Sequence, residues 1–181
     1  TFSGRSVAAR TSQGRCTFSL YEGTSDYGEI VICDGVNEPF LFQMTGTGGL
    51  ASRTFFAKEI TVSGTTGPAF GVIHDKHLVV AGASTAKNTI FYSGTNDIDS
   101  FSSTGSGSIV IQDAVVGLAS FRSDLIIFCK NSIHKLININ NSSTVAVVPI
   151  TTNVGCVNGG SIQEVGGDIL FLAPDGVRTI A

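Results

Sequence analysis

The sequence predicts an all-β protein built from a repeated unit of short strands. Two observations support this prediction. First, a pair of apolar strands joined by a polar turn occurs four times along the chain, at 30–32 with 39–42, 78–80 with 90–92, 125–128 with 133–136, and 169–172 with 177–180. Second, glycine is abundant, at 22 of 181 residues, and no segment shows a sustained helical period.

The spacing of the repeat indicates the architecture. The first strands of the four pairs begin at Ile30, Leu78, Leu125 and Ile169, which are 48, 47 and 44 residues apart. A repeat of this length built from strands is the period of one β-propeller blade. We therefore expect a β-propeller-type repeat of four-stranded blades, with about four units of 44–48 residues visible and the ring incomplete.

The chain divides into two parts. Residues 1–15 have few bulky apolar side chains and no clear period, so they are expected to form a poorly patterned N-terminal segment. The strand pattern begins at 16–21 and continues to the end, which predicts a β-propeller-type domain over 16–181. The fourth unit stops at Ile180 and Ala181, inside its second strand, so we expect this domain to be part of a longer protein.

The segments between the strands have the composition of turns. Asp34-Gly35 and Asp175-Gly176 lie between the two strands of their units, where they predict hairpin turns that need a positive φ. Residues 130–132 occupy the same place in the third unit, and the second unit is predicted to have a longer bridge over 81–89. The segments 60–62, 109–111 and 145–150 are expected to supply the remaining strands of each blade.

Composition limits the class of function. The chain has 11 basic and 14 acidic residues, a net charge of −3, and no two adjacent basic residues. A dedicated duplex-DNA surface needs clustered Lys and Arg, so this balance argues against one. Charged residues make up 14%, against roughly 25% in typical domains. A near-neutral, hydroxyl-rich surface is typical of proteins that pack into larger assemblies.

The sequence shows no membrane or secretion signal. Its apolar runs, such as 115–119 and 125–129, are about five residues long, whereas a transmembrane helix needs roughly 20. The first residues lack the charged start and apolar stretch of a signal peptide. Asn140 and Asn141 each begin an N-x-Ser/Thr motif, which we interpret as chance matches because no secretory signal accompanies them.

The four cysteines are predicted to be free thiols. Cys16, Cys33, Cys129 and Cys156 form no C-x-x-C pair, and their gaps are too irregular for a zinc ribbon. Cys33 and Cys129 lie beside strand ends among apolar neighbours, where a free cysteine behaves as a small hydrophobic side chain.

The densest group of titratable residues is 74–77, with the sequence His-Asp-Lys-His. On a helix, His74 and His77 would share one face and could bind a metal ion. The apolar segments on both sides instead predict a solvated hairpin turn, and His134, in another unit, offers no third ligand.

Two further polar patterns are interpreted as loop structure. Asp97 and Asp99 alternate as in some calcium loops, but the glycine and closing glutamate of an EF-hand loop are missing, so Asx-turns are expected. The glycine pairs 48–49, 159–160 and 166–167 open no predicted helix and precede no Gly-Lys-Ser/Thr motif. They are therefore expected to be turns at strand ends.

The sequence predicts no enzymatic activity and no catalytic, cofactor-binding or metal-binding residues. No G-x-S-x-G motif is present, and the three histidines form no triad with a serine and an acid by inspection. The carboxylates are few and scattered.

The second half of the chain carries an ordered series of motifs at 72–82, 90–94 up to Phe101, 116–118, 125–134, 150–157 and 169–178. The order of these motifs is more specific than any single motif. In this order, residues 70–181 resemble the tail tubular proteins, or tail nozzle proteins, of short-tailed bacteriophages of podovirus type. His77 departs from the pattern, which is expected to have Arg there. The first 70 residues match only through 31–35 ahead of Pro39-Phe40.

This resemblance implies a structural role in the virion. Proteins of this family have a β-propeller-type body and form a homohexameric ring that extends the DNA channel below the portal and its adaptor protein. The chain is then expected in the virion tail, assembled in the host cytoplasm. It would retain the packaged genome and conduct double-stranded DNA during ejection without sequence-specific binding. Its expected partners are its own copies and the adaptor, and tail fibres or the tail tip are further candidates. A low-charge acidic chain suits a conduit because DNA must slide through it.

Two other classes of propeller stay open as alternatives. One is a carbohydrate-binding module or glycosidase, against which the absence of Trp and of a Ser-x-Asp-x-Gly-x-Thr box argues. The other is a protein-binding scaffold of WD40 or kelch type, against which the absence of any Trp-Asp pair argues.

Overall fold

The structure consists of four antiparallel β-sheets that follow one another along the chain. A computed structural model describes residues 15–22, 28–45 and 54–180, and the account below concerns those residues. They contain strands, turns and one short 3₁₀ segment, η2 (Gly159–Ser161). The prediction of an all-β fold is confirmed. Closure of the sheets into a propeller stays a prediction.

The first two sheets have four strands each, and neighbouring strands in space are neighbours in sequence. The first sheet contains β1 (Thr17–Tyr21), β2 (Glu29–Cys33), β3 (Phe40–Thr45) and β4 (Thr54–Glu59). The second sheet contains β5 (Phe70–His74), β6 (His77–Ala83), β7 (Ala86–Tyr92) and β8 (Gly107–Val110).

The third sheet repeats this order, and the fourth has three described strands. The third sheet contains β9 (Val115–Phe121), β10 (Asp124–Cys129), β11 (Ile133–Ile137) and β12 (Ala146–Thr151). The fourth sheet contains β13 (Gln163–Val165), β14 (Asp168–Ala173) and β15 (Gly176–Ile180). Every pairing is antiparallel, so each sheet is a meander.

The four strand pairs predicted from the sequence are the second and third strands of the four sheets. They correspond to β2–β3, β6–β7, β10–β11 and β14–β15, and this part of the prediction is confirmed. Two details were wrong. The segment 81–89 is no long bridge, because β6 and β7 extend through it to the short turn at Ser84-Thr85. The segment 60–62 forms no strand, although Ile60 and Val62 are buried.

The predicted hairpin turns at Asp34-Gly35 and Asp175-Gly176 are present. Gly35 has φ +79° and Gly176 has φ +134°. Asp34 stabilises its turn because its Oδ1 accepts hydrogen bonds from the backbone N–H groups of Val36 and Asn37, at 3.0 and 2.8 Å. This is the Asx-type pattern that favours Asp at the start of a turn.

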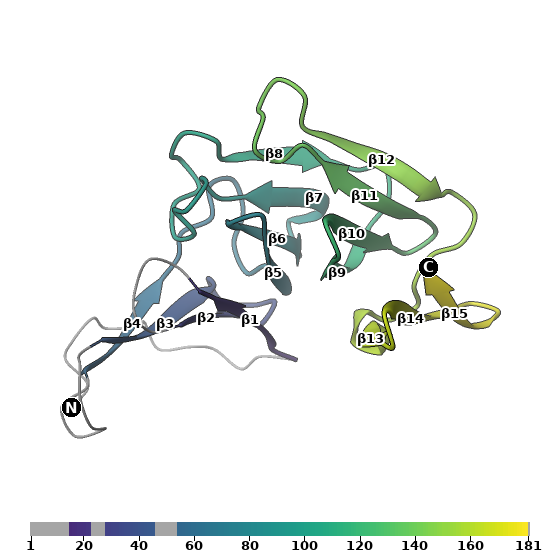
Figure 1. Ribbon diagram of the computed structural model, residues 1–181, viewed down its shortest axis with the longest axis horizontal. Helices are drawn as coiled ribbons and strands as arrows, with labels where there is room; N and C mark the ends of the chain where they lie inside the picture. Colours follow the sequence, from purple (N-terminus) through teal and green to yellow (C-terminus); the bar gives the residue numbers. More distant parts are fainter. Residues whose placement is uncertain (1–14, 23–27, 46–53, 181) are drawn as a thin grey trace.

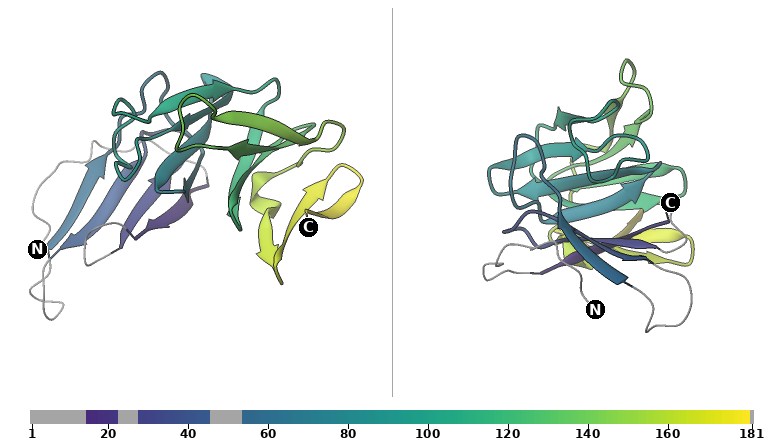
Figure 2. Two further views of the ribbon diagram at one scale, coloured as in Figure 1. Left: turned by 45° about the horizontal axis from the view of Figure 1, so that its top comes forward. Right: turned by 90° about the vertical axis from the view of Figure 1, so that its left-hand side faces the viewer.

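The sheets are arranged along an arc (Figure 1), and the second view makes the order from the first to the fourth sheet clear (Figure 2). The first strands β1, β5, β9 and β13 lie on the inner side of this arc, and β4, β8 and β12 lie on its outer side. Strand β5 contacts both β1 and β9, and β9 contacts η2. The inner strands of the first three sheets are therefore neighbours, and β9 meets the segment before β13.

One hydrophobic cluster fills each space between successive sheets. Between the first and second sheets, Val31 and Cys33 of β2 meet Leu78 and Val80 of β6. The second cluster joins β6 and β7 to β10 and β11, and the third joins β10 to β14. The centre of the third cluster is the pair Phe128 and Phe171, with ring centroids 5.3 Å apart. The core thus consists of three layers between four sheets.

All four cysteines are free thiols, as predicted. Cys33, Cys129 and Cys156 are buried, and Cys33 and Cys129 belong to hydrophobic clusters. Burial raises the pKa of the Cys129 thiol to about 12, and the nearby Asp113 carboxylate adds to this effect. Because the thiolate is the reactive form, Cys129 is inert near neutral pH.

Two predictions fall on residues outside the described ranges, namely the patterning of 1–14 and the turn at Gly48-Gly49.

The other two glycine pairs lie within the described ranges. Gly166-Gly167 forms a turn at strand ends, between β13 and β14, as predicted. Gly159-Gly160 instead lies in the 3₁₀ segment η2, contrary to the prediction.

No helix in the described part of the chain has the length and apolar character needed to cross a membrane.

The interface between the third and fourth sheets gives a test of this core. Phe128 is fully buried, so Phe128→Ala is expected to lower the free energy of unfolding by about 3–5 kcal/mol, as for other buried aromatic residues. Chemical denaturation followed by circular dichroism measures this change. Val110→Ala, at a position that is 70% exposed, is the control and should change stability by less than about 0.5 kcal/mol. Equal effects of the two substitutions would contradict the assigned core.

Candidate functional site

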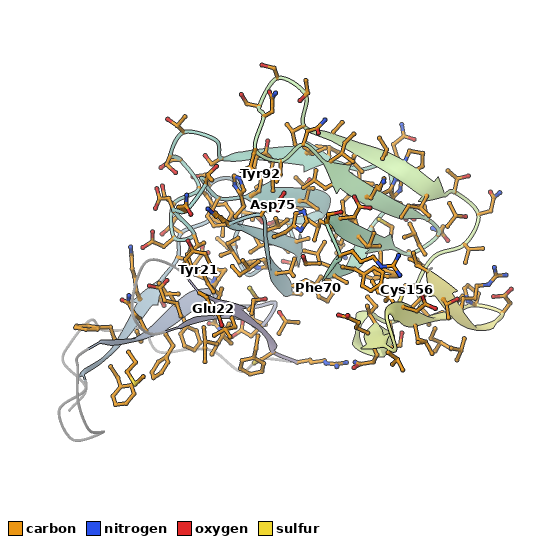
Figure 3. The ribbon with its side chains drawn as sticks, in the orientation of Figure 1. Tyr21, Glu22, Phe70, Asp75, Tyr92 and Cys156 are labelled. Atoms are coloured by element: carbon orange, nitrogen blue, oxygen red, sulfur yellow. The ribbon has the colours of Figure 1, made fainter. Side chains whose placement is uncertain are left out.

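The principal cavity lies on the inner side of the arc of sheets. It encloses about 610 Å³ and is lined by the inner strands β1, β5 and β9 together with the segment from Asn158 to Glu164. Phe70, labelled in Figure 3, is one of its lining residues and stands at the start of β5. All four sheets therefore contribute to this one space, which makes it the candidate functional site.

Hydrogen bonds from hydroxyl groups join the two inner strands β1 and β5 at this cavity. The Ser19 hydroxyl donates to the backbone oxygen of Gly71 at 2.7 Å, and the Thr17 hydroxyl donates to that of Ala69 at 3.2 Å. The Gly71 N–H lies 3.3 Å from the Thr17 hydroxyl oxygen. These strands belong to different sheets, so the hydroxyls take the place of a backbone ladder. Alternation on β1 makes this possible by pointing Thr17, Ser19 and Tyr21 to one face.

Two glycines allow the inner strands to approach their neighbours. A Cβ atom on Gly71 of β5 would lie 2.7 Å from the Cys33 sulfur of the first sheet. A Cβ atom on Gly117 of β9 would collide with Cδ1 of Ile162. Both positions are closer than van der Waals contact, so a larger residue would force the Cys33 or the Ile162 side chain to shift.

The lining of the cavity carries few charges. Arg15 and Glu164 are its exposed charged residues, and Asp34 is buried and bonded within its own turn. The Arg15 guanidinium lies 3.5 Å from the backbone oxygen of Gly160, which brings the segment before β1 close to η2. The remaining lining is mainly glycine backbone, hydroxyls and apolar side chains. Such a surface can hold a neutral ligand or polypeptide but offers no concentrated charge.

A histidine–serine pair joins the second and third sheets at the edge of the cavity. His74 is buried at the end of β5, and its Nδ1 lies 2.9 Å from Oγ of Ser120, an exposed residue of β9. Burial lowers the pKa of His74, although the carboxylates of Asp75 and Asp124 act in the opposite direction. The imidazole is therefore neutral near pH 7 and can accept the Ser120 hydroxyl proton.

This pair has part of the geometry of an activated nucleophile, which needs a base within hydrogen-bond distance and a third group that orients the base. The Asp75 carboxylate is 4.0 Å from Nε2 of His74, too far for a hydrogen bond. The third group is thus not in place. No sequence pattern indicates this contact, because His74 and Ser120 are 46 residues apart on different sheets.

The predicted turn at 74–77 is present, but its histidines are buried rather than solvated. Asp75 and Lys76 form the turn, with φ of 45° and 66°. His77 is fully buried, and its Nδ1 donates to the backbone oxygen of Ser93 at 2.5 Å. Its Nε2 lies 3.1 Å from both Oγ1 of Thr95 and Oδ1 of Asn140. His77 therefore links the second sheet to the loop before β12 of the third sheet.

Asp97 and Asp99 border a second cavity of about 440 Å³, between the first sheet and the loop after β7. Asp99 forms an ion pair with Lys58 of β4. Burial raises the pKa of Asp99, but the hydrogen bond and charge of Lys58 outweigh this and the pKa is lowered overall. Glu29, on the same cavity, has a raised pKa because of burial and the Asp99 charge. Asp99 thus forms a contact between the first and second sheets, and the Asx-turn role of Asp97 and Asp99 stays a prediction.

Within the described ranges, no three His, Cys, Asp or Glu side chains gather closely enough to hold a metal ion.

The chain matches none of the known protein family models with which it was compared, and no curated protein is significantly similar to it in sequence.

The close approach at Gly71 can be tested by adding a single methyl group. Gly71→Ala places Cβ against the Cys33 sulfur, so we expect the free energy of unfolding to fall by about 1–3 kcal/mol, as for other overpacked sites. Chemical denaturation measures this loss. The matched control is the double variant Gly71→Ala/Cys33→Ala, which removes the sulfur. Its stability should exceed the sum expected from the two single variants, and simple additivity would contradict the assigned contact.

The buried His74 predicts a dependence of stability on pH. Its pKa is lower in the folded protein than its ordinary value of about 6.5, so the unfolded chain binds the proton more readily. The stabilisation is therefore complete above about pH 6.5 and is lost as the pH falls through the lower, folded-state pKa. Denaturation of wild-type protein and His74→Gln from pH 7.5 to 5 measures this. The variant should show the shallower decline, and parallel curves would contradict the assignment.

Proposed function

We propose that the four sheets are blades of a β-propeller-type body. Three observations support this proposal. Each four-stranded sheet is a meander, as in a propeller blade. The inner strands are the first strands of their sheets, and all of them border one central cavity. Successive sheets pack face to face through separate hydrophobic clusters.

We further propose that the chain is a structural component of a bacteriophage tail, where it forms part of the nozzle ring. The observation that carries this proposal is the ordered set of motifs over residues 70–181 that resembles tail nozzle proteins of short-tailed phages. These residues form the second, third and fourth sheets. The motifs therefore lie on the strands and turns of consecutive blades rather than on scattered loops.

The proposed work of this component is mechanical. Six copies would form a ring that extends the DNA channel below the portal and its adaptor, retains the packaged genome and conducts it during ejection. The net charge of −3 and the isolated positions of the basic residues support a surface along which DNA slides. The proposed partners are further copies of the chain, the adaptor, and fibres or a tail tip below. The place of action is the virion tail.

Electron microscopy of the native particle that contains this chain tests the proposal. The expected result is a sixfold ring around an axial channel, coaxial with the portal, into which the four sheets of this structure fit as consecutive blades. Particles that lack the protein serve as the control and should lose this density. An isolated propeller outside any ring would contradict the nozzle role and would favour a carbohydrate- or protein-binding module that uses its central cavity.

A further inference from the structure

The Ser120 hydroxyl lies between the central cavity and the buried ring of His74. Ser120 is an exposed residue of β9 and lines the cavity of about 610 Å³. His74, at the end of β5, is 6% exposed and borders a separate cavity of about 450 Å³. The two side chains meet across the interface of the second and third sheets, with Nδ1 of His74 2.9 Å from Oγ of Ser120. A solute in the central cavity can therefore reach the hydroxyl, while the ring behind it is shielded from water.

The surroundings of the ring determine which nitrogen carries the proton in its neutral form. The Asp75 carboxylate, labelled in Figure 3, lies 4.0 Å from Nε2 and attracts a proton on that nitrogen. Nδ1 is then the acceptor for the Ser120 hydroxyl. The charges of Asp75 and Asp124 also favour the imidazolium that forms once the ring has taken this proton. A hydroxyl within hydrogen-bond distance of an unprotonated ring nitrogen is the arrangement that a general base requires.

The backbone N–H of Ser120 points to the free edge of the same strand. The turn at 122–123 joins β9 to β10 and is closed by the pair of Phe121 and Asp124. The closing pair of a two-residue hairpin exchanges backbone hydrogen bonds, and bonded and non-bonded pairs alternate from there along the ladder. The next pair, Ser120 with Leu125, is therefore non-bonded, and the Ser120 N–H is directed away from β10. At this inner edge it can donate to the oxygen anion of an acyl group that is attached to the Ser120 hydroxyl.

We propose that Ser120 is a nucleophile toward small uncharged carboxylic esters held in the central cavity, and that His74 is its general base. Oγ of Ser120 bonds to the ester carbonyl carbon, its proton passes to Nδ1 of His74, and the bond from this carbon to the alcohol oxygen breaks. The alcohol leaves with the proton from His74. Water then attacks the acyl-serine, His74 takes a proton from the water and returns it to Oγ, and the carboxylic acid is released.

The lining of the cavity and the position of Asp75 define the expected substrate and rate. The weakly charged lining favours an uncharged ester over an ionic one. Because Asp75 is too far from Nε2 to orient the ring by a hydrogen bond, the reaction is expected to be slower than that of a complete Ser-His-Asp triad. This activity adds to the proposed structural role in the virion and does not depend on it.

Acylation by p-nitrophenyl acetate tests the proposal. The full chain is expected to release p-nitrophenolate in a burst of about one equivalent and to gain one acetyl group, located on Ser120 by mass spectrometry of its peptides. Ser120→Ala should abolish the burst. His74→Gln should slow it about 100-fold or more, the usual contribution of a general base. Ser108→Ala removes another exposed strand serine, on β8, and as the matched control should react like the wild type.

The pH dependence of the burst distinguishes a general base from a residue that only supports the fold. Attack needs the neutral ring of His74. Burial lowers the pKa of this ring, His77 acts in the same direction, and Asp75 and Asp124 act in the opposite one. The wild-type burst rate is therefore expected to rise as the pH passes the folded-state pKa, below about 6.5, and to level off above it. In His74→Gln this inflection should be absent.

Three results would overturn the proposal. The first is a wild-type chain without an acetyl group on Ser120, and the second is a burst that Ser120→Ala leaves unchanged. The third is a His74→Gln variant that is folded by circular dichroism and reacts at the wild-type rate. Should His74→Gln fail to fold, the wild-type pH profile decides, because a rate without an inflection below about pH 6.5 excludes His74 as the base.

Discussion

The structure depends on one constraint, which is that the second strand of each sheet is apolar on both faces. Such a strand cannot leave either face in water without loss of hydrophobic stabilisation, so a sheet built around it needs a sheet on each side. Strand β6 and strand β10 satisfy this requirement, and together they contribute to all three hydrophobic clusters. The order of the sheets in space then follows their order in sequence, because each meander packs on the one that precedes it.

Face-to-face packing of twisted sheets brings their inner strands close together, and the residues of these strands reflect that crowding. Gly71 and Gly117 occupy points where a side chain would collide with the neighbouring sheet or its connecting segment. Thr17 and Ser19 bond across to backbone oxygens of the next inner strand. Small residues and hydroxyls therefore allow the sheets to converge around the central cavity. The same residues leave that cavity weakly charged, because none of them carries an ionisable side chain.

The sequence predicted features that depend on local pattern and missed those that depend on contacts between sheets. Strands β6 and β10 and the turns at Asp34 and Asp175 were predictable, because alternation and turn residues act within a few positions. The burial of His77 was not, because its partners Thr95 and Asn140 lie on loops that only the stacking of sheets brings near. Ile60 was taken for a strand residue because a buried connecting segment has the same apolar composition as a strand.

Polar contacts between sheets explain how apolar faces adopt one relative position. Hydrophobic attraction is non-directional, so the three clusters alone would tolerate sliding of one sheet over another. A directional contact accompanies the cluster at each of the first two interfaces. Ser19 bonds to the backbone of the second sheet at the first interface, and His74 and His77 bond to Ser120 and Asn140 of the third sheet at the second interface. Leaving a buried histidine without its partner costs about 1–3 kcal/mol. An arrangement in which the second and third sheets had slid past each other is therefore penalised at His74 and His77, even when its apolar contact is equally large. Burial thus holds the sheets together, and these few hydrogen bonds determine their alignment around the cavity.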